Sequence, residues 1–385
     1  MLPFGRMLQY GNIKPAIEIV DVQCTMYGIF VLYNNGELYY RGFNGNGESG
    51  SGDNIPKYTW YKCDVPDLVS KIYTGDSASI IVTRNNKVYH AGWGVYFNIG
   101  TVNNTYVDRT PLFESAGIDI STMKICFGTR GLMALSGGTL YAIGQGTNAG
   151  ASRYGNVGLG SATNRSSFYQ VGTNVKDMFA SCNSNSESSF YITNDGQLYS
   201  TGRNINGGCG LGFVGEVPTF TKVTIPAVPR TVIGSNMGFI IPCTNGELYM
   251  TGSRGEGRLG DGTVAYVNYT TPTKNTLVDS TFVNSINNSM HTFVSDYMIL
   301  FSTGTPYASG ADYNGECAIG IKNGSYSVYT PASYVADFST FTHRGGGYFR
   351  IMFNSSEIYM AGMARYYTGI TSDDFLVFTK IQKPY

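Results

Sequence analysis

The feature that most constrains this chain is a short segment that recurs seven times along its 385 residues. Each copy alternates apolar and polar residues, and its tyrosine is followed three positions later by glycine, as in GELYYRG from Gly36 and GELYMTG from Gly246. The copies lie 50 to 58 residues apart, and self-similarity at such a period indicates a repeat architecture. The tyrosines are Tyr39, Tyr89, Tyr141, Tyr199, Tyr249, Tyr307 and Tyr359, and the glycines are Gly42, Gly92, Gly144, Gly202, Gly252, Gly310 and Gly362.

The alternation within each copy predicts a β-strand with both faces covered, since a large apolar side chain such as Leu38 lies opposite the tyrosine. Turn pairs such as Asn35-Gly36 join this strand to an upstream β-rich run in a tight hairpin. A glycine-rich loop then leads to a further strand, for example FTKVTIP from Phe220. About four short strands per repeat, without a helix, predict an all-β, seven-bladed β-propeller of four-stranded blades. We expect one propeller domain over residues 1–385.

The loop after Gly42, GFNGNGESGSGD, could in principle cradle a phosphate. A dinucleotide-binding loop needs a helix that starts at its third glycine, because the N-terminal amides of that helix hold the phosphate. Here the loop runs into IPKYTWYK, an extended segment, and a similar loop follows nearly every copy. We interpret the seven repeat glycines as structural turn residues at positive φ, and we expect no cofactor.

The repeat resembles that of the regulator of chromosome condensation family, which forms seven-bladed propellers. The shared features are the small residue and glycine that close the tyrosine strand, a proline before the next strand, and a Leu-Gly or Ile-Gly pair in the loop. Family repeats usually place tryptophan before the closing glycine, where this chain has small residues. The loop pairs are Ile99-Gly100, Leu159-Gly160, Leu211-Gly212, Leu259-Gly260 and Ile319-Gly320.

The phase of the repeats predicts how the ring closes. The chain begins inside a repeat, with AIEIVDVQC as an inner strand, and it ends with FLVFTKIQKPY, which matches the strand after the loop in other repeats. We expect Phe375 to Lys380 to complete the sheet that the N-terminal segment begins, because this pairing would remove an exposed strand edge.

Residues suited to catalysis or metal binding are few and scattered. The seven cysteines show no metal-like spacing, so we interpret them as free thiols, those of the inner strands buried. The three histidines, His90, His291 and His343, fall in three repeats and lack a partner at the spacing of a catalytic triad. We therefore expect no catalytic residue and no metal site, and we predict that the protein is not an enzyme.

The loops after the repeat glycines carry aromatic and cationic side chains that differ from repeat to repeat. Tyr, Trp and Arg dominate the hot spots of protein interfaces, and a propeller presents such loops together at one end. We predict a partner-binding rim there, while local packing over the blades is an equally open interpretation. The rim comprises Trp93, Tyr96, Phe97, Tyr154, Arg254, Tyr313, Tyr366 and Tyr367.

Composition narrows the choice of partners. Charged residues make up 14% of the chain and the formal net charge is zero, so nothing attracts nucleic acid electrostatically. No apolar run is long enough for a membrane span, and the N-terminus lacks the apolar core of a secretory signal. The expected partners are other proteins.

Three functions remain open at this point. The low charge, the many Tyr, Asn, Ser and Gly residues and the opening FGRMLQYGN resemble tailed-phage particle proteins, which favours a non-enzymatic decoration, tail or adhesion protein of the virion. Its partners would be virion components or a host receptor, with a glycan-binding adhesin as a variant. The family resemblance implies a regulatory scaffold or a guanine-nucleotide exchange factor, with a cytoplasmic location as the alternative. An enzyme such as a lyase or hydrolase is the third class.

Overall fold

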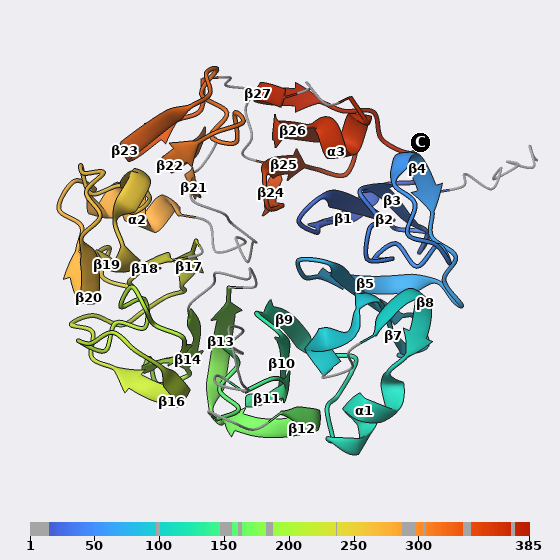
Figure 1. Cartoon of the computed structure of the whole chain (residues 1–385), viewed down its shortest axis with the longest axis horizontal. Coiled ribbons are helices and arrows are strands. Elements are labelled where there is room, and N and C mark those ends of the chain that lie inside the picture. Colours follow the sequence, from blue (N-terminus) through green and yellow to red (C-terminus); the bar gives the residue numbers. More distant parts are fainter. Residues whose placement is uncertain are drawn as a thin grey trace, which may run out of the picture.

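The structure is a computed structural model that describes residues 15–97, 101–146, 156–160, 164–181, 188–235, 237–286, 297–302, 305–333, 340–370 and 374–385. The described strands form separate antiparallel sheets arranged in a ring (Figure 1). Six sheets have four strands and one has three, and each sheet is built from strands that are consecutive in the chain. The predicted all-β propeller is confirmed. The prediction of seven four-stranded blades is not, because only six sheets have four described strands.

We number the sheets in chain order. Sheet 1 contains β1 (Ile19–Cys24), β2 (Gly28–Tyr33), β3 (Leu38–Gly42) and β4 (Lys57–Lys62). Sheet 2 contains β5 (Val69–Thr74), β6 (Ala78–Thr83), β7 (Val88–Trp93) and β8 (Val102–Asp108). Sheet 3 contains β9 (Lys124–Gly128), β10 (Gly131–Ser136), β11 (Thr139–Gly144) and β12 (Arg165–Gly172). Sheet 4 contains β13 (Val175–Ala180), β14 (Ser188–Thr193), β15 (Leu198–Gly202) and β16 (Val217–Val223).

The remaining sheets follow the same pattern. Sheet 5 contains β17 (Ile233–Gly234), β18 (Gly238–Pro242), β19 (Leu248–Ser253) and β20 (Asn268–Lys274). Sheet 6 contains β21 (Tyr297–Ser302), β22 (Thr305–Asp312) and β23 (Gly324–Pro331). Sheet 7 contains β24 (Thr342–Gly345), β25 (Phe349–Phe353), β26 (Ile358–Met363) and β27 (Asp374–Lys380).

Short helices interrupt the connections, which the sequence pattern did not predict. They are the α-helices α1 (Thr110–Ser115), α2 (Ser280–Ser285) and α3 (Arg365–Thr368) and the 3₁₀ turns η1 (Gly94–Phe97) and η2 (Gly255–Gly257). Each is at most six residues long, so a periodic apolar stripe has no room to develop.

The hydrophobic core lies between neighbouring sheets, and the alternation of the repeat strand decides which side chain faces which sheet. Leu38 is buried in a cluster with Val69 and Ile81 of sheet 2. Tyr39, its neighbour in the chain, packs against the cluster that contains Ile351 of sheet 7. The predicted covering of both strand faces is thus confirmed, and each buried leucine contributes about 1.5–3 kcal/mol to folding.

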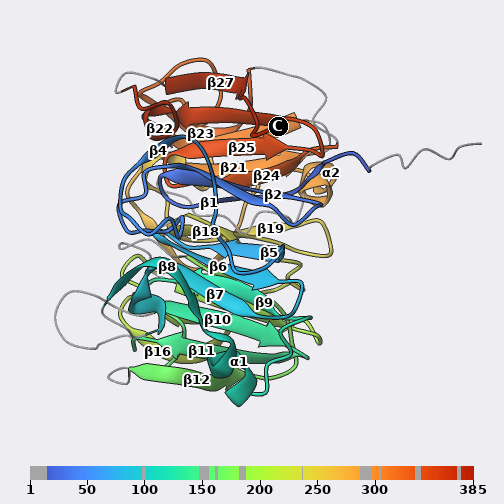
Figure 2. The same ribbon diagram turned by 90° about the vertical axis from the view of Figure 1, so that its right-hand side faces the viewer.

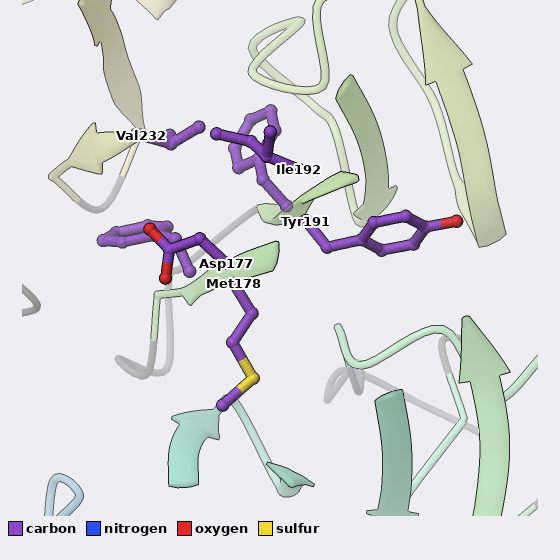
Figure 3. Close-up of a pocket in the computed structure, with 7 residues that line it drawn as sticks. Asp177, Met178, Tyr191, Ile192 and Val232 are labelled. Atoms are coloured by element: carbon purple, nitrogen blue, oxygen red, sulfur yellow. The ribbon is translucent and has the colours of Figure 1, made fainter. Parts of the chain in front are cut away.

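Sheet 4 shows the same two-sided packing in detail (Figure 3). Met178 and Tyr191 belong to the cluster shared with sheet 3, and Ile192 and Val232 belong to the cluster shared with sheet 5. In Figure 3 Met178 points away from the Ile192 and Val232 pair. The small hollow between them has no room for a water molecule, so it is a packing feature of the core.

The glycine that closes each repeat strand has a positive φ in all seven repeats, between +89° and +148°. At Gly42 the reason is a close approach of two backbones: the residue pairs with Gly28 of the neighbouring strand, and an added Cβ would overlap the Cα of Gly28. Glycine is the residue that adopts this conformation without steric cost.

The loop after the repeat strand also links each sheet to the next. A loop glycine donates its backbone N–H to a carbonyl of the outer strand of the following sheet, and this explains the Leu-Gly or Ile-Gly pair of the sequence. The glycine of a Leu-Gly or Ile-Gly pair takes this role at Gly160, Gly212 and Gly320. In two other loops the role falls to Gly262, three residues after Leu259, and to Gly52, which follows Ser51. The bonds are Gly52 to Asn104 at 2.7 Å, Gly160 to Pro218 at 2.9 Å, Gly212 to Thr270 at 2.7 Å, Gly262 to Ser327 at 2.7 Å and Gly320 to Leu376 at 2.9 Å.

The predicted closure of the ring by strand pairing is wrong. In the described residues β27 pairs only with β26 and β1 only with β2, so the two termini lie in separate sheets without a ladder between them. The physical reason is that four consecutive strands complete each of these sheets, which leaves no vacant position for a strand from the other end. Sheets 7 and 1 are nevertheless neighbours in the ring (Figures 1 and 2).

The seam between sheets 7 and 1 is held by individual contacts. The Arg344 guanidinium pairs with the carboxylate of Asp21 at 3.2 Å. Arg41 Nε donates to the carbonyl of Tyr367 in α3 at 2.9 Å. The C-terminal segment after β27 crosses onto sheet 1, where Trp60 Nε1 donates to the carbonyl of Gln382 at 2.8 Å. Side chains and the C-terminal segment therefore replace the expected strand ladder.

Candidate interaction face

One edge of the ring carries both the turns between the first and second strands and the loops after the third strands, because neighbouring strands in each sheet are antiparallel. Tyr27, in such a turn of sheet 1, contacts Phe43, in the loop after β3, with ring centroids 5.9 Å apart. We call this edge the loop face. The predicted rim residues that the structure describes lie at this edge, Trp93 as the last residue of β7 and the others in its loops.

Tyr96 and Phe97 are not on the surface of the loop face, so the prediction that they form part of an exposed rim is wrong. The 3₁₀ turn η1 buries both side chains, which are 1% and 0% exposed. Tyr96 packs edge-on against Phe127 of sheet 3, with centroids 4.9 Å apart, and Phe97 packs edge-on against His90 at 5.0 Å. Both residues belong to the core between sheets 2 and 3.

Tyr367 is also buried, at 6% exposure, and its place in the predicted rim is wrong for the same reason. The Arg41 guanidinium lies 3.7 Å from the centre of its ring, and the Tyr367 hydroxyl donates to the carbonyl of Gln382 at 3.1 Å. Its role is therefore to join sheets 7 and 1.

Four predicted rim residues remain accessible on the loop face: Trp93, Arg254, Tyr313 and Tyr366. They lie in different repeats and do not form one cluster. Trp93 is half-buried beneath the Arg130 guanidinium, 5.4 Å from its ring. Arg254 is held by Asp261, with Nε and Oδ2 2.6 Å apart. Tyr313 is 51% exposed. Tyr154 lies outside the described residues.

The structure reveals an aromatic cluster at the seam that sequence reasoning missed. Tyr27 lies 4.3 Å from Tyr366 and 5.7 Å from Tyr348, while Phe43 lies 5.8 Å from Tyr366, all measured between ring centroids. Phe43 is 36% exposed and the three tyrosines are half-buried. We call these four residues the seam cluster. The available signal was a tyrosine directly before the second strand in both the first and the last repeat.

Two carboxyl groups lie close to this part of the loop face, that of the buried Glu48 and that of the half-buried Asp76. Glu48 is 2% exposed, and its carboxylate accepts the backbone N–H of Asn46 at 3.0 Å. Burial raises its pKa to about 7. Burial likewise raises the pKa of Asp76 to about 7, and the negative charge of Asp76 raises the pKa of Glu48 further. Both carboxyl groups should therefore lose their proton near neutral pH.

A Glu48→Gln substitution should make the protein more stable at pH 8 than the parent, by about 2–3 kcal/mol. The raised pKa means that between the ordinary value of 4.5 and about 7 the unfolded chain is ionised at Glu48 and the folded protein is not, so rising pH costs stability through this window. Glutamine cannot ionise, and its carboxamide oxygen can still accept the Asn46 N–H. Urea unfolding at pH 4.5 and pH 8 measures the effect; an equal difference between the two proteins at both pH values would contradict it.

The remaining histidines and cysteines that the structure describes do not form a catalytic or metal-binding arrangement. His90 and His343 are buried in the sheets, and burial lowers the pKa of His90 to about 3 and that of His343 well below its ordinary value. Six cysteines in the described part of the chain form no disulfide bond, and five of them are buried. Within that part, no three His, Cys, Asp or Glu side chains come together in a way that could hold a metal ion. Cys182 and His291 lie outside the described residues.

A cleft of about 450 Å³ opens between sheets 5 and 6, away from the seam. Its lining is mainly apolar, with Leu277, Phe282, Tyr307 and Tyr329. The carboxylate of Asp279, which also lines it, accepts the backbone N–H of Phe282 at 2.8 Å and so caps α2. The cleft thus offers hydrophobic surface without a free catalytic group.

No family model matches the chain. The chain is 28% identical to the X-linked retinitis pigmentosa GTPase regulator of Canis lupus familiaris over 184 residues, which are 46% of this chain and 17% of that protein. It is 25% identical to the ultraviolet-B receptor UVR8 of Arabidopsis thaliana over 199 residues, 51% of this chain and 44% of the receptor. The similarity therefore spans less than half the length of either relative.

The solved structure of yeast RCC1 (Prp20) bound to Kap60 aligns with 99% of this chain and 92% of its own, with a TM-score of 0.72 and 14% identity. This chain has an RCC1-like β-propeller fold. Prp20p of Saccharomyces cerevisiae, in a separate structure, aligns with 87% of this chain and 82% of its own, with a TM-score of 0.65 and 19% identity. Among the described residues, no helix has both the length and the apolar character needed to cross a membrane.

Proposed function

We propose that this protein is a non-enzymatic, protein-binding scaffold and that the loop face is its binding surface. The observation that carries the proposal is the set of accessible aromatic and arginine side chains on that face, including the seam cluster, Trp93 and Tyr313. Such residues supply most of the binding energy in protein interfaces. A ring of packed sheets holds their loops rigidly, which lowers the entropy cost of binding.

The structural neighbours support a scaffold role. The neighbour Prp20p is described with binding properties to Gsp1p and histones, and yeast RCC1 (Prp20) is bound to Kap60. These are protein partners of propellers with the same fold. Their partners do not transfer to this chain by fold alone.

Site-specific photo-crosslinking tests the proposal. A photoreactive amino acid at Trp93 or Tyr313 should crosslink to a partner protein, while the same group at Tyr169, on the outer strand β12 and 49% exposed, should not. Alanine at Trp93 should weaken binding of the captured partner by about tenfold or more. Crosslinks that form only from Tyr169, or unchanged affinity of the Trp93→Ala protein, would contradict the proposal.

The setting that we propose is the virion of a tailed phage, as a decoration, tail or adhesion protein. The support is compositional: zero net charge, 14% charged residues and 30 tyrosines. Mass spectrometry of purified particles tests it, and absence of the protein from them would rule it out.

The alternative is a regulatory scaffold, favoured by the similarity to a GTPase regulator. Its sharpest form is nucleotide exchange on a small GTPase. Acceleration of GDP release by the purified protein would support an exchange activity. An unchanged release rate across a panel of small GTPases would exclude the exchange-factor hypothesis.

A further inference from the structure

The seam cluster is preorganised by contacts among its own rings. Tyr27 is the centre, since its ring contacts those of Phe43, Tyr348 and Tyr366. The four side chains come from sheets 1 and 7, so the platform exists only where the ends of the propeller meet. A ligand that lies on this platform would not have to order it first.

A carboxyl oxygen without a hydrogen-bond partner adjoins the platform. Asp76 lies in the turn between β5 and β6, and its carbonyl accepts the backbone N–H of Met26, the neighbour of Tyr27, at 2.9 Å. Burial raises the pKa of Tyr27, and the negative charge of Asp76 is close enough to raise it further. Its Oδ1 atom is buried and accepts no hydrogen bond in the part of the chain that the structure describes. A buried oxygen of this kind favours a nearby positive charge.

The seam already accepts guanidinium groups. Arg41 lies 3.7 Å from the ring centre of Tyr367, and Arg365 lies 5.2 Å from that of Tyr366. Aromatic faces attract cations through the ring quadrupole. Above about pH 7, where Asp76 ionises, its carboxylate adds a negative charge beside these rings. Because the whole chain has a net charge of zero, any preference for a cation must come from local groups such as these.

We propose that the seam cluster binds a lysine or arginine side chain of a protein partner, with Tyr27 as the aromatic platform and Asp76 as the counter-charge. The inference rests on the proposed protein-binding function and specifies the chemistry of the partner: an exposed basic segment.

A fluorescein-labelled tetralysine peptide, measured by fluorescence polarisation, tests the proposal against the same peptide with all four side chains acetylated. Acetylation removes the charge and keeps the apolar stem. The parent protein should bind the charged peptide about tenfold more tightly than the acetylated one. Tyr27→Leu, which removes the ring, and Asp76→Asn, which removes the charge, should each weaken binding about tenfold, while Tyr27→Phe should retain it.

Tyr169→Leu is the matched control, because Tyr169 is an exposed tyrosine on the outer strand β12, away from the loop face, and this change should leave peptide binding unaltered. Thermal unfolding of each variant shows whether it is folded, and the Tyr27→Phe protein keeps the test decisive if Tyr27→Leu is unstable. Equal binding by Tyr27→Leu and Tyr27→Phe, or equal binding of the two peptides, would overturn the proposal. If crosslinking still places a partner on the loop face in that case, the scaffold function stands and only the cation site fails.

Discussion

Replacing Gly252 with alanine should lower the free energy of unfolding by about 3 kcal/mol or more. Gly252 has φ +89° near the end of β19, and an added Cβ would overlap the carbonyl oxygen of Met237. That oxygen belongs to the backbone directly before Gly238, which pairs with Gly252, so relief of the overlap would disturb the ladder between β18 and β19. Urea unfolding followed by far-UV circular dichroism measures the loss.

Gly212→Ala is the matched control. Gly212 has nearly the same backbone conformation, φ +88°, but the nearest atom to an added Cβ is Cγ2 of Thr271 at an ordinary 3.6 Å. The free energy of unfolding of this variant should fall by only about 1–2 kcal/mol, the cost of placing alanine at a positive φ. Similar losses in both proteins would mean that the backbone overlap at Gly252 contributes nothing, and that positive φ alone explains the repeat glycine.

The fold was predictable because two features of the blade, a strand covered on both faces and a tight approach to the neighbouring strand, are specified within each repeat. The alternation of Leu38 and Tyr39 specifies a strand with two covered faces, and the glycine three residues after the tyrosine specifies the positive φ at which that strand approaches its neighbour. A loop glycine such as Gly212 then links one sheet to the next. Each of these features involves residues of one repeat or of two adjacent repeats. The periodic sequence pattern is therefore enough to predict them.

The seam was not predictable in the same way, because it joins residues at opposite ends of the chain. Tyr27 and Tyr348 are more than 300 residues apart, and nothing in their own repeats shows that they stack. The expected pairing of Phe375 to Lys380 with the N-terminal segment failed because sheet 1 already has four strands from its own repeat. Position in a loop was likewise a poor guide to exposure: η1 turns Tyr96 and Phe97 into the core, which residue type alone could not reveal.

Replacing Tyr367 with alanine should destabilise the propeller by about 3 kcal/mol, whereas Tyr366→Ala, one residue earlier, should cost about 1 kcal/mol. Tyr367 is 6% exposed, so its replacement by alanine leaves a cavity. The Arg41 guanidinium also loses the aromatic ring against which it packs. The replacement also removes the donor to the carbonyl of Gln382, which helps to hold the C-terminal segment against sheet 1. Tyr366 is half-buried, and its ring contacts Tyr27, Phe43 and the Arg365 guanidinium.

Differential scanning calorimetry of the two variants separates the roles of these adjacent tyrosines. The Tyr367→Ala protein should unfold several degrees below the parent, and the Tyr366→Ala protein should unfold close to the parent while binding the tetralysine peptide more weakly. Loss of Tyr367 should also loosen the contact of Trp60 with Gln382, which a shift of the Trp60 indole N–H resonance would report. Equal destabilisation by both changes would mean that the seam cluster holds sheets 7 and 1 together as strongly as the buried contacts of Tyr367 in α3.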